Sequence, residues 1–275
     1  MDPALVELVD GAWETFRAHK GKSYYLPGSM PILFFGDLSK YTSSRIKIIT
    51  IGVNPSKEEF PEDDLLVRFP LMKNRLDCLE SGRLGDLDKQ AYVNAISDYF
   101  AEQPYQWFKA SEHVLNQIDS SYYPKDGHHN TVLHTDFCTP LAVKGNWGKL
   151  TDGRGGQKAS LLEPGNDLWY HLIEFLNPHI MIASVQENLA SQIRGHFSRG
   201  RFSPTDSSVF YSISHTKFGK PRRDVYEVHK WESGGAPVLF SGEPKNGVPF
   251  GSVSIENRNA IGRRIKNWFL ATHNS

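Results

Sequence analysis

Residues 46–56, IKIITIGVNPS, set the expectation for the fold. The first part of this stretch, 46–53, is apolar or β-branched at most positions, and an Asn-Pro-Ser turn follows it. A short run that is apolar on both faces is typical of a strand buried in a parallel sheet. The sequence therefore predicts a buried strand that ends in a polar turn.

Similar runs and helical patterns alternate along the rest of the chain. Further strands are predicted at 131–137, 180–185 and 209–214. Helical periodicity covers 3–18, 88–102, 105–118, 166–176, 186–197 and 256–271, and Asn166 is the expected N-cap of the fourth helix. This alternation indicates a three-layer α/β/α fold with a central, mostly parallel sheet of about four strands. We expect one domain over residues 1–275, with long Gly-rich loops at 143–166 and 233–254.

The composition indicates an ordinary globular protein, with 39% apolar and 23% charged residues. No apolar run reaches the roughly 18 residues of a membrane span, and the acidic N-terminus does not resemble a signal peptide. We therefore expect a cytoplasmic protein without a membrane partner. The only cysteines, Cys78 and Cys138, are too few for a four-cysteine metal site. We expect neither a metal nor another cofactor.

The net charge is zero, but the charges are unevenly placed. The segment 194–223 carries seven Lys and Arg residues and a single acid, Asp206, whereas 58–64 is acidic. A basic segment of this kind is compatible with binding a phosphate backbone, and an ordinary solvated surface explains it as well.

Polar residues follow three of the four predicted strands. Gly52-Val53-Asn54-Pro55-Ser56 follows the first, HTDFCTPL at 134–141 ends the second, and SHTKFGKP at 214–221 follows the fourth. Ligands of open α/β sheets bind at the carboxyl ends of strands. We therefore expect these segments to converge on one edge of the sheet and form a site.

In this order and spacing, the three segments resemble the uracil-DNA glycosylase superfamily. Residues 49–56 resemble its Gly-x-Asn-Pro-small first motif, and 134–141 is similar to the His-Asn-x-Cys-Pro-Leu strand of the single-strand-selective branch. That match is offset by one inserted residue on each side of Phe137-Cys138, and 214–221 takes the place of the His-containing final motif. The resemblance, over roughly 30–225, implies a monomer that flips a nucleotide out of DNA and hydrolyses its N-glycosidic bond.

The resemblance assigns catalytic roles to Asn54 and His215. Asn54 would orient the attacking water, because an amide can both donate and accept hydrogen bonds but is not a base. His215 would stabilise negative charge at the base O2. The ordinary alternatives are a turn-capping Asn before Pro55 and a loop histidine.

Asp136 stands where the related branch carries an Asn that reads uracil. An ionised carboxylate repels the C4 carbonyl of uracil but accepts well from the N4 amino group of cytosine. Cytosine protonated at N3 would offer two donors to the two carboxylate oxygens and would leave more easily. We hypothesise that Asp136 selects a cytosine-type base and helps it depart. The alternative is a misaligned, ordinary strand-end acid.

Further residues are expected to surround the base or bind the DNA. Phe69 would stack on the base or pack in the core, the small Ser56 would leave room for a group at C5, and Phe218 would fill the vacated stack. The expected base pocket comprises Gly52, Pro55, Ser56, Phe69 and His134; the expected DNA-binding residues are Lys217, Phe218, Lys220, Arg222 and Arg223.

These features predict a monofunctional glycosylase for a bulky 5-substituted cytosine, such as the glucosylated 5-hydroxymethylcytosine of phage DNA, acting in antiviral defence. The substrate follows from the resemblance together with Asp136 and Ser56. One alternative is a repair glycosylase for uracil or another deaminated base. Others are a non-catalytic nucleic-acid-binding module and an N-glycoside hydrolase of small molecules.

Overall fold

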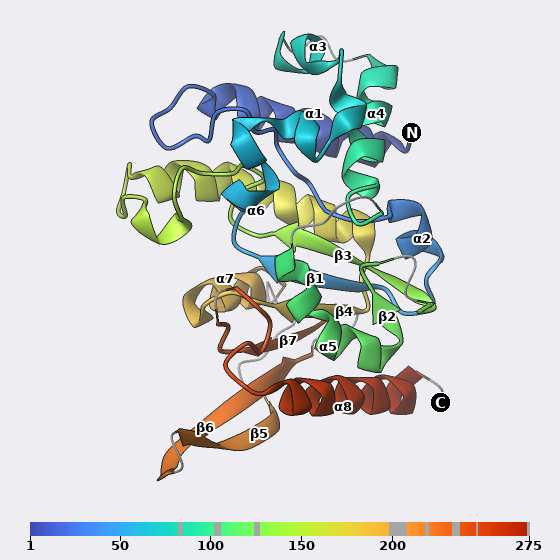
Figure 1. The fold of residues 1–275 in the computed structure, drawn as a ribbon, viewed down its shortest axis with the longest axis vertical. Helices are drawn as coiled ribbons and strands as arrows, with labels where there is room; N and C mark the ends of the chain where they lie inside the picture. Colours follow the sequence, from blue (N-terminus) through green and yellow to red (C-terminus); the bar gives the residue numbers. More distant parts are fainter. Residues whose placement is uncertain are drawn as a thin grey trace. The chain divides into compact units, whose positions relative to one another are not determined.

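The computed structural model describes residues 1–81, 85–101, 106–123, 127–197, 208–217, 220–232, 237–245 and 247–273. Its strands form a seven-stranded sheet in the order β2-β3-β1-β4-β7-β6-β5, flanked by helices (Figure 1). The α/β class is thus confirmed, while the expected number of about four strands is wrong. The chain divides into two compact units. One comprises Met1–Thr42, Gly52–Tyr105 and Leu133–Asn177, and the other Ser43–Ile51, Gln106–Val132 and Pro178–Ser275.

The strands combine a parallel part and an antiparallel part. Their bounds are β1 Ile48–Gly52, β2 Ser120–Ser121, β3 Asn130–Asp136, β4 Ile180–Ala183, β5 Ser208–Lys217, β6 Lys220–Trp231 and β7 Val238–Gly242. Strand β4 pairs in parallel with β1 and β7, which aligns Ile51, Ala183 and Ser241 in one row. Every residue of β1, β3 and β4 is buried. Runs that are apolar on both faces predict this for β1 and β4, whereas β3 also buries polar residues such as Asn130, His134 and Asp136.

Two expectations about strands are wrong. The run 209–214 belongs to β5, an edge strand antiparallel to β6, and its Val209 is 51% exposed. The stretch 233–254, expected to be a loop, contains β7, which occupies the parallel position beside β4. The two errors have different physical causes. A short apolar run does not reveal the direction of its neighbour, which explains the error at β5, and the three apolar residues of β7 are too few to give a clear periodicity.

The helices follow the predicted periodicity at most positions. The α-helices are α1 Pro3–His19, α2 Leu38–Ser43, α3 Leu76–Ser81, α4 Asp86–Ser97, α5 Glu112–Leu115, α6 Gln157–Leu176, α7 Glu187–Phe197 and α8 Ile255–His273. The 3₁₀ turns are η1 Lys57–Glu59, η2 Pro61–Asp63, η3 Leu65–Val67, η4 Pro70–Met72, η5 Gln106–Ala110, η6 Asn116–Ile118 and η7 Trp147–Lys149. Within the described ranges, no helix is long and apolar enough to cross a bilayer.

Two helix predictions need correction. The segment 105–118 is not one helix, because its described residues form η5, α5 and η6 in succession. Helix α6 begins at Gln157 rather than after Asn166, its N-cap is Gly156, and Pro164 lies inside it. Buried Leu161 continues the apolar stripe of α6 backwards, so packing outweighs the helix-breaking tendency of the proline.

Helix α6 is held closely against the end of β3. The indole Nε1 of Trp169 donates a hydrogen bond of 3.0 Å to the Thr135 hydroxyl. At Gly165, an added Cβ would lie 2.1 Å from the Cys138 carbonyl oxygen, so the helix backbone can approach only because this residue has no side chain.

Gly165→Ala is therefore expected to destabilise the protein by about 2–3 kcal/mol, because the new methyl group must push α6 away from β3. Urea unfolding measures this loss. Gly195→Ala in α7 is the matched control, since no described atom lies within 4 Å of its added Cβ. Equal unfolding free energies for the two variants would refute the close approach.

Candidate active site at the ends of β1 and β3

The structure brings the ends of β1 and β3 together. The Phe137 amide donates to the Gly52 carbonyl at 3.0 Å, and the Cys138 amide donates to the Val53 carbonyl at 2.9 Å. These bonds continue the pairing of the strands beyond β3. The first and second predicted motifs therefore lie side by side.

Two side chains of β3 lie over Gly52. Because strand residues alternate between faces, Thr135 points towards α6, whereas His134 and Asp136 share the other face. An added Cβ at Gly52 would lie 2.4 Å from Asp136 Oδ1 and 2.9 Å from His134 Nε2. These two atoms are 3.6 Å apart, and each side chain is only 4% exposed. Gly52 is thus required sterically, and the carboxyl and imidazole groups occupy one largely dry site.

Asn54 lies in the turn directly after β1 and is half-buried. Its Nδ2 donates a hydrogen bond of 2.8 Å to the carbonyl of Pro55, which is buried. This contact matches the turn-capping alternative and fixes the amide. In the described part of the chain nothing donates to Asn54 Oδ1, so this oxygen can accept a hydrogen bond from a water molecule. Ser56 is half-buried, and its hydroxyl accepts from the Glu58 amide at 3.2 Å.

Phe69 belongs to a buried aromatic cluster. Its side chain is 0% exposed, and its ring centroid lies 5.8 Å from both the Phe60 ring and the Tyr99 ring. Tyr99 in turn packs on Phe35 at 4.7 Å. Phe35 pairs with β3 through a hydrogen bond of 2.9 Å from its amide to the His134 carbonyl. Phe69 therefore packs in the core, and its stacking on a base stays a prediction.

Glu59 is a buried carboxyl group that the sequence pattern did not single out. It ends η1 and is 2% exposed, and the Tyr99 hydroxyl donates a hydrogen bond to its Oε2. Burial raises the pKa of Glu59 to about 8; the Tyr99 hydrogen bond and the Arg68 charge oppose this rise, and the charges of Asp136 and Glu58 add to it. Glu59 is thus mostly protonated at neutral pH. Strongly perturbed buried carboxyls concentrate at functional sites.

The predicted final motif lies at the end of β5, an edge strand that pairs antiparallel with β6. Strand β5 runs through His215, and its register pairs Lys217 with Lys220 of β6. The expected convergence of 214–221 with the other two strand ends stays a prediction. The side chains of His215 and of the predicted DNA-binding residues Lys217, Lys220, Arg222 and Arg223 lie outside the described part of the structure, as does Phe218.

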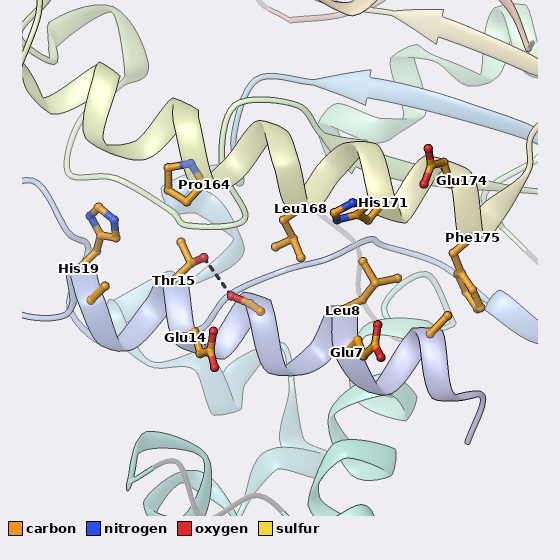
Figure 2. Close-up of a pocket in the computed structure, with 13 residues that line it drawn as sticks. Glu7, Leu8, Glu14, Thr15, His19, Pro164, Leu168, His171, Glu174 and Phe175 are labelled. Carbon is orange, nitrogen blue, oxygen red and sulfur yellow. Dashed lines mark hydrogen bonds between the residues drawn. The ribbon is translucent and has the colours of Figure 1, made fainter. Parts of the chain in front are cut away.

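A separate groove of about 660 Å³ lies between α1 and α6 (Figure 2). Its lining combines the acids Glu7, Glu14 and Glu174 with apolar residues that include Leu8 and Leu168. No residue of the predicted site lines it. The groove is therefore distinct from the candidate site at the ends of β1 and β3.

No protein-family model and no curated protein matches the sequence. Among the described residues, no group of three or more His, Cys, Asp or Glu side chains could hold a metal ion.

The raised pKa of Glu59 makes stability depend on pH in a defined direction. Between its ordinary value of 4.5 and about 8, the folded state holds a proton that the unfolded state has lost. The wild type should therefore lose stability relative to Glu59→Gln as the pH rises through this window, by up to about 1.4 kcal/mol per pH unit. Urea unfolding of both proteins at pH 5, 6.5 and 8 measures the difference. Parallel pH dependences would contradict a protonated Glu59.

Proposed function

We propose that the chain is a monofunctional DNA glycosylase that excises a 5-substituted cytosine and leaves an abasic site. One observation carries the proposal: the Asp136 carboxyl group lies over Gly52, directly beside the strand end from which Asn54 emerges. An amide that can orient water and a carboxylate that can read a base are thus presented by adjoining segments. This arrangement supports hydrolysis of a flipped nucleotide, which needs a positioned water and a group that recognises the base.

Asn54 is the residue that positions the water. Its Nδ2 is held by the Pro55 carbonyl, which leaves Oδ1 to accept a hydrogen bond from a water molecule near C1′. The amide orients this water without removing its proton, because an amide is not a base at neutral pH. The chemistry therefore depends on a leaving base that is readily displaced.

Asp136 is the residue that selects the base. Its carboxylate accepts from the N4 amino group of cytosine and repels the C4 carbonyl of uracil. Since its side chain is 4% exposed, little water competes for this contact, which strengthens the hydrogen bond and the discrimination. The small, half-buried Ser56 supports acceptance of a base with a substituent at C5.

DNA binding is assigned to the basic segment of the β5–β6 hairpin. Strand β5 ends at Lys217 and β6 begins at Lys220, so basic residues are concentrated in this part of the sequence, which is compatible with binding a phosphate backbone. Arg222 and Arg223 follow in β6 and add to the positive charge. Bulky cytosine modifications are common in phage DNA, so excision of such a base fits an antiviral defence enzyme.

The test is incubation with duplexes that contain uracil, cytosine, 5-hydroxymethylcytosine or its glucosylated form. Mass spectrometry identifies the released base, and alkaline cleavage reports abasic sites. Release of the modified cytosine supports the proposal. Release of uracil alone supports a repair enzyme, cleavage of free nucleosides alone supports a small-molecule hydrolase, and DNA binding without release supports a binding module.

Asp136→Asn should lower excision of the cytosine-type base by about 10–100-fold and shift the preference towards uracil, because an amide can donate to the C4 carbonyl. Single-turnover excision assays on both DNAs give the ratio. Asp152→Asn is the control, since the Asp152 side chain is 78% exposed and pairs with Lys158 at the surface. An unchanged preference in Asp136→Asn would exclude this carboxylate from base selection.

Asn54→Ala should reduce the excision rate by about 100- to 1,000-fold while DNA binding is retained, because the water loses its orienting group. Single-turnover rates and fluorescence-anisotropy binding separate the two effects. Asn94→Ala on the exposed side of α4 serves as the control. A fully active Asn54→Ala protein would show that Asn54 only caps its turn.

A further inference from the structure

We infer that Glu59 is the acid of this site: it donates a hydrogen bond to N3 of a cytosine-type base held by Asp136 and transfers that proton as the glycosidic bond breaks. The inference rests on the proposed function and goes beyond it, because it names the source of the proton that the departing base needs. Neither the motif resemblance nor the acidic run 58–64 assigns such a role to Glu59.

Three buried side chains, those of Tyr99, Phe35 and His134, connect Glu59 with Asp136, and the Asp136 charge acts on Glu59. The Tyr99 hydroxyl donates to Glu59 Oε2, and the Tyr99 ring lies 4.7 Å from the Phe35 ring. The Phe35 ring lies 6.0 Å from the His134 ring, and His134 Nε2 lies 3.6 Å from Asp136 Oδ1. The two carboxyl groups therefore belong to one buried assembly that includes the aromatic cluster.

The surroundings of Glu59 keep its proton in place at neutral pH. Burial is the largest influence, and the groups that act on it are Tyr99, Arg68, Asp136 and Glu58. Tyr99 and Arg68 favour the ionised form, whereas the two neighbouring acids oppose it. The net result is a pKa of about 8, so at pH 7 the group is a carboxylic acid that can donate.

A carboxylate and a carboxylic acid together match the edge of cytosine. Cytosine presents an amino donor at N4 and an acceptor at N3, which Asp136 and Glu59 can satisfy respectively. Uracil presents a carbonyl at C4 and an N–H at N3, so both contacts would be mismatched. The pair therefore rejects uracil at two positions.

The bonds, electron pairs and protons of this step balance. The C1′–N1 bond breaks and its electron pair stays with the base, while the Glu59 proton moves to N3, so that the base departs neutral. The water held by Asn54 adds its oxygen to C1′. The proton that this water loses returns to Glu59, which restores the acid.

Glu59→Gln tests the inference, because glutamine keeps an oxygen that can accept from Tyr99 but has no proton to transfer. Single-turnover excision of the cytosine-type base should fall by about 100- to 10,000-fold at pH 7, with DNA affinity retained. In the wild type the rate should fall as the pH rises through about 8, and this falling limb should be absent in the variant. Glu112→Gln is the matched control, a buried carboxyl group that binds the Ser121 hydroxyl and the Tyr122 amide.

Tyr99→Phe provides a second readout that a purely structural role would not produce. Loss of a hydrogen bond that lowers the pKa of Glu59 should move the falling limb of the rate profile to higher pH. If the wild type excises the base and Glu59→Gln keeps both the wild-type rate and the fall of that rate at high pH, this inference is wrong while the proposed function stands. An unmoved limb in Tyr99→Phe would also overturn the inference. A wild-type protein that releases no base would overturn the proposed function and this inference together.

Discussion

The Phe137 and Cys138 amides donate hydrogen bonds to the Gly52 and Val53 carbonyls, and these bonds hold the ends of β1 and β3 side by side. These hydrogen bonds fix the register of β3 against β1. Because side chains of β3 alternate between faces, this register puts Asp136 over Gly52. A slip of one residue would turn Asp136 away and bring Thr135 to the site. The proximity of Asn54 and Asp136 therefore follows from backbone pairing.

The burial of two carboxyl groups, Glu59 and Asp136, also constrains the site. A buried carboxyl is unfavourable unless it is neutral or partnered. Glu59 meets this condition by holding its proton and by accepting a hydrogen bond from Tyr99, whereas Asp136 lies beside His134. Environments that differ in this way allow one carboxyl to accept and the other to donate. Under the proposed function, that division of roles would let the site distinguish cytosine from uracil.

Strands β1 and β4 could be predicted because their residues are apolar on both faces, and α1, α7 and α8 because their periodicity is clear. The antiparallel pairing of β5 with β6 could not, since an apolar run is the same in a parallel and an antiparallel pair. Asn54 and Asp136 could be proposed as site residues from their places at strand ends and from the motif resemblance. Glu59 was not, because its sequence neighbours are acidic and its burial depends on Tyr99, a tertiary contact that no local pattern reveals.

The central claim is that Asp136 receives the exocyclic amino group of an everted cytosine-type base. The most direct measurement is a crystal structure of the inactive Asn54→Ala protein bound to a duplex that still contains the substrate base. The account predicts an Asp136 carboxylate oxygen about 3 Å from N4, with the base outside the duplex. A base that remains stacked in the DNA, or an amino group bound elsewhere while Asp136 stays against His134, would contradict it.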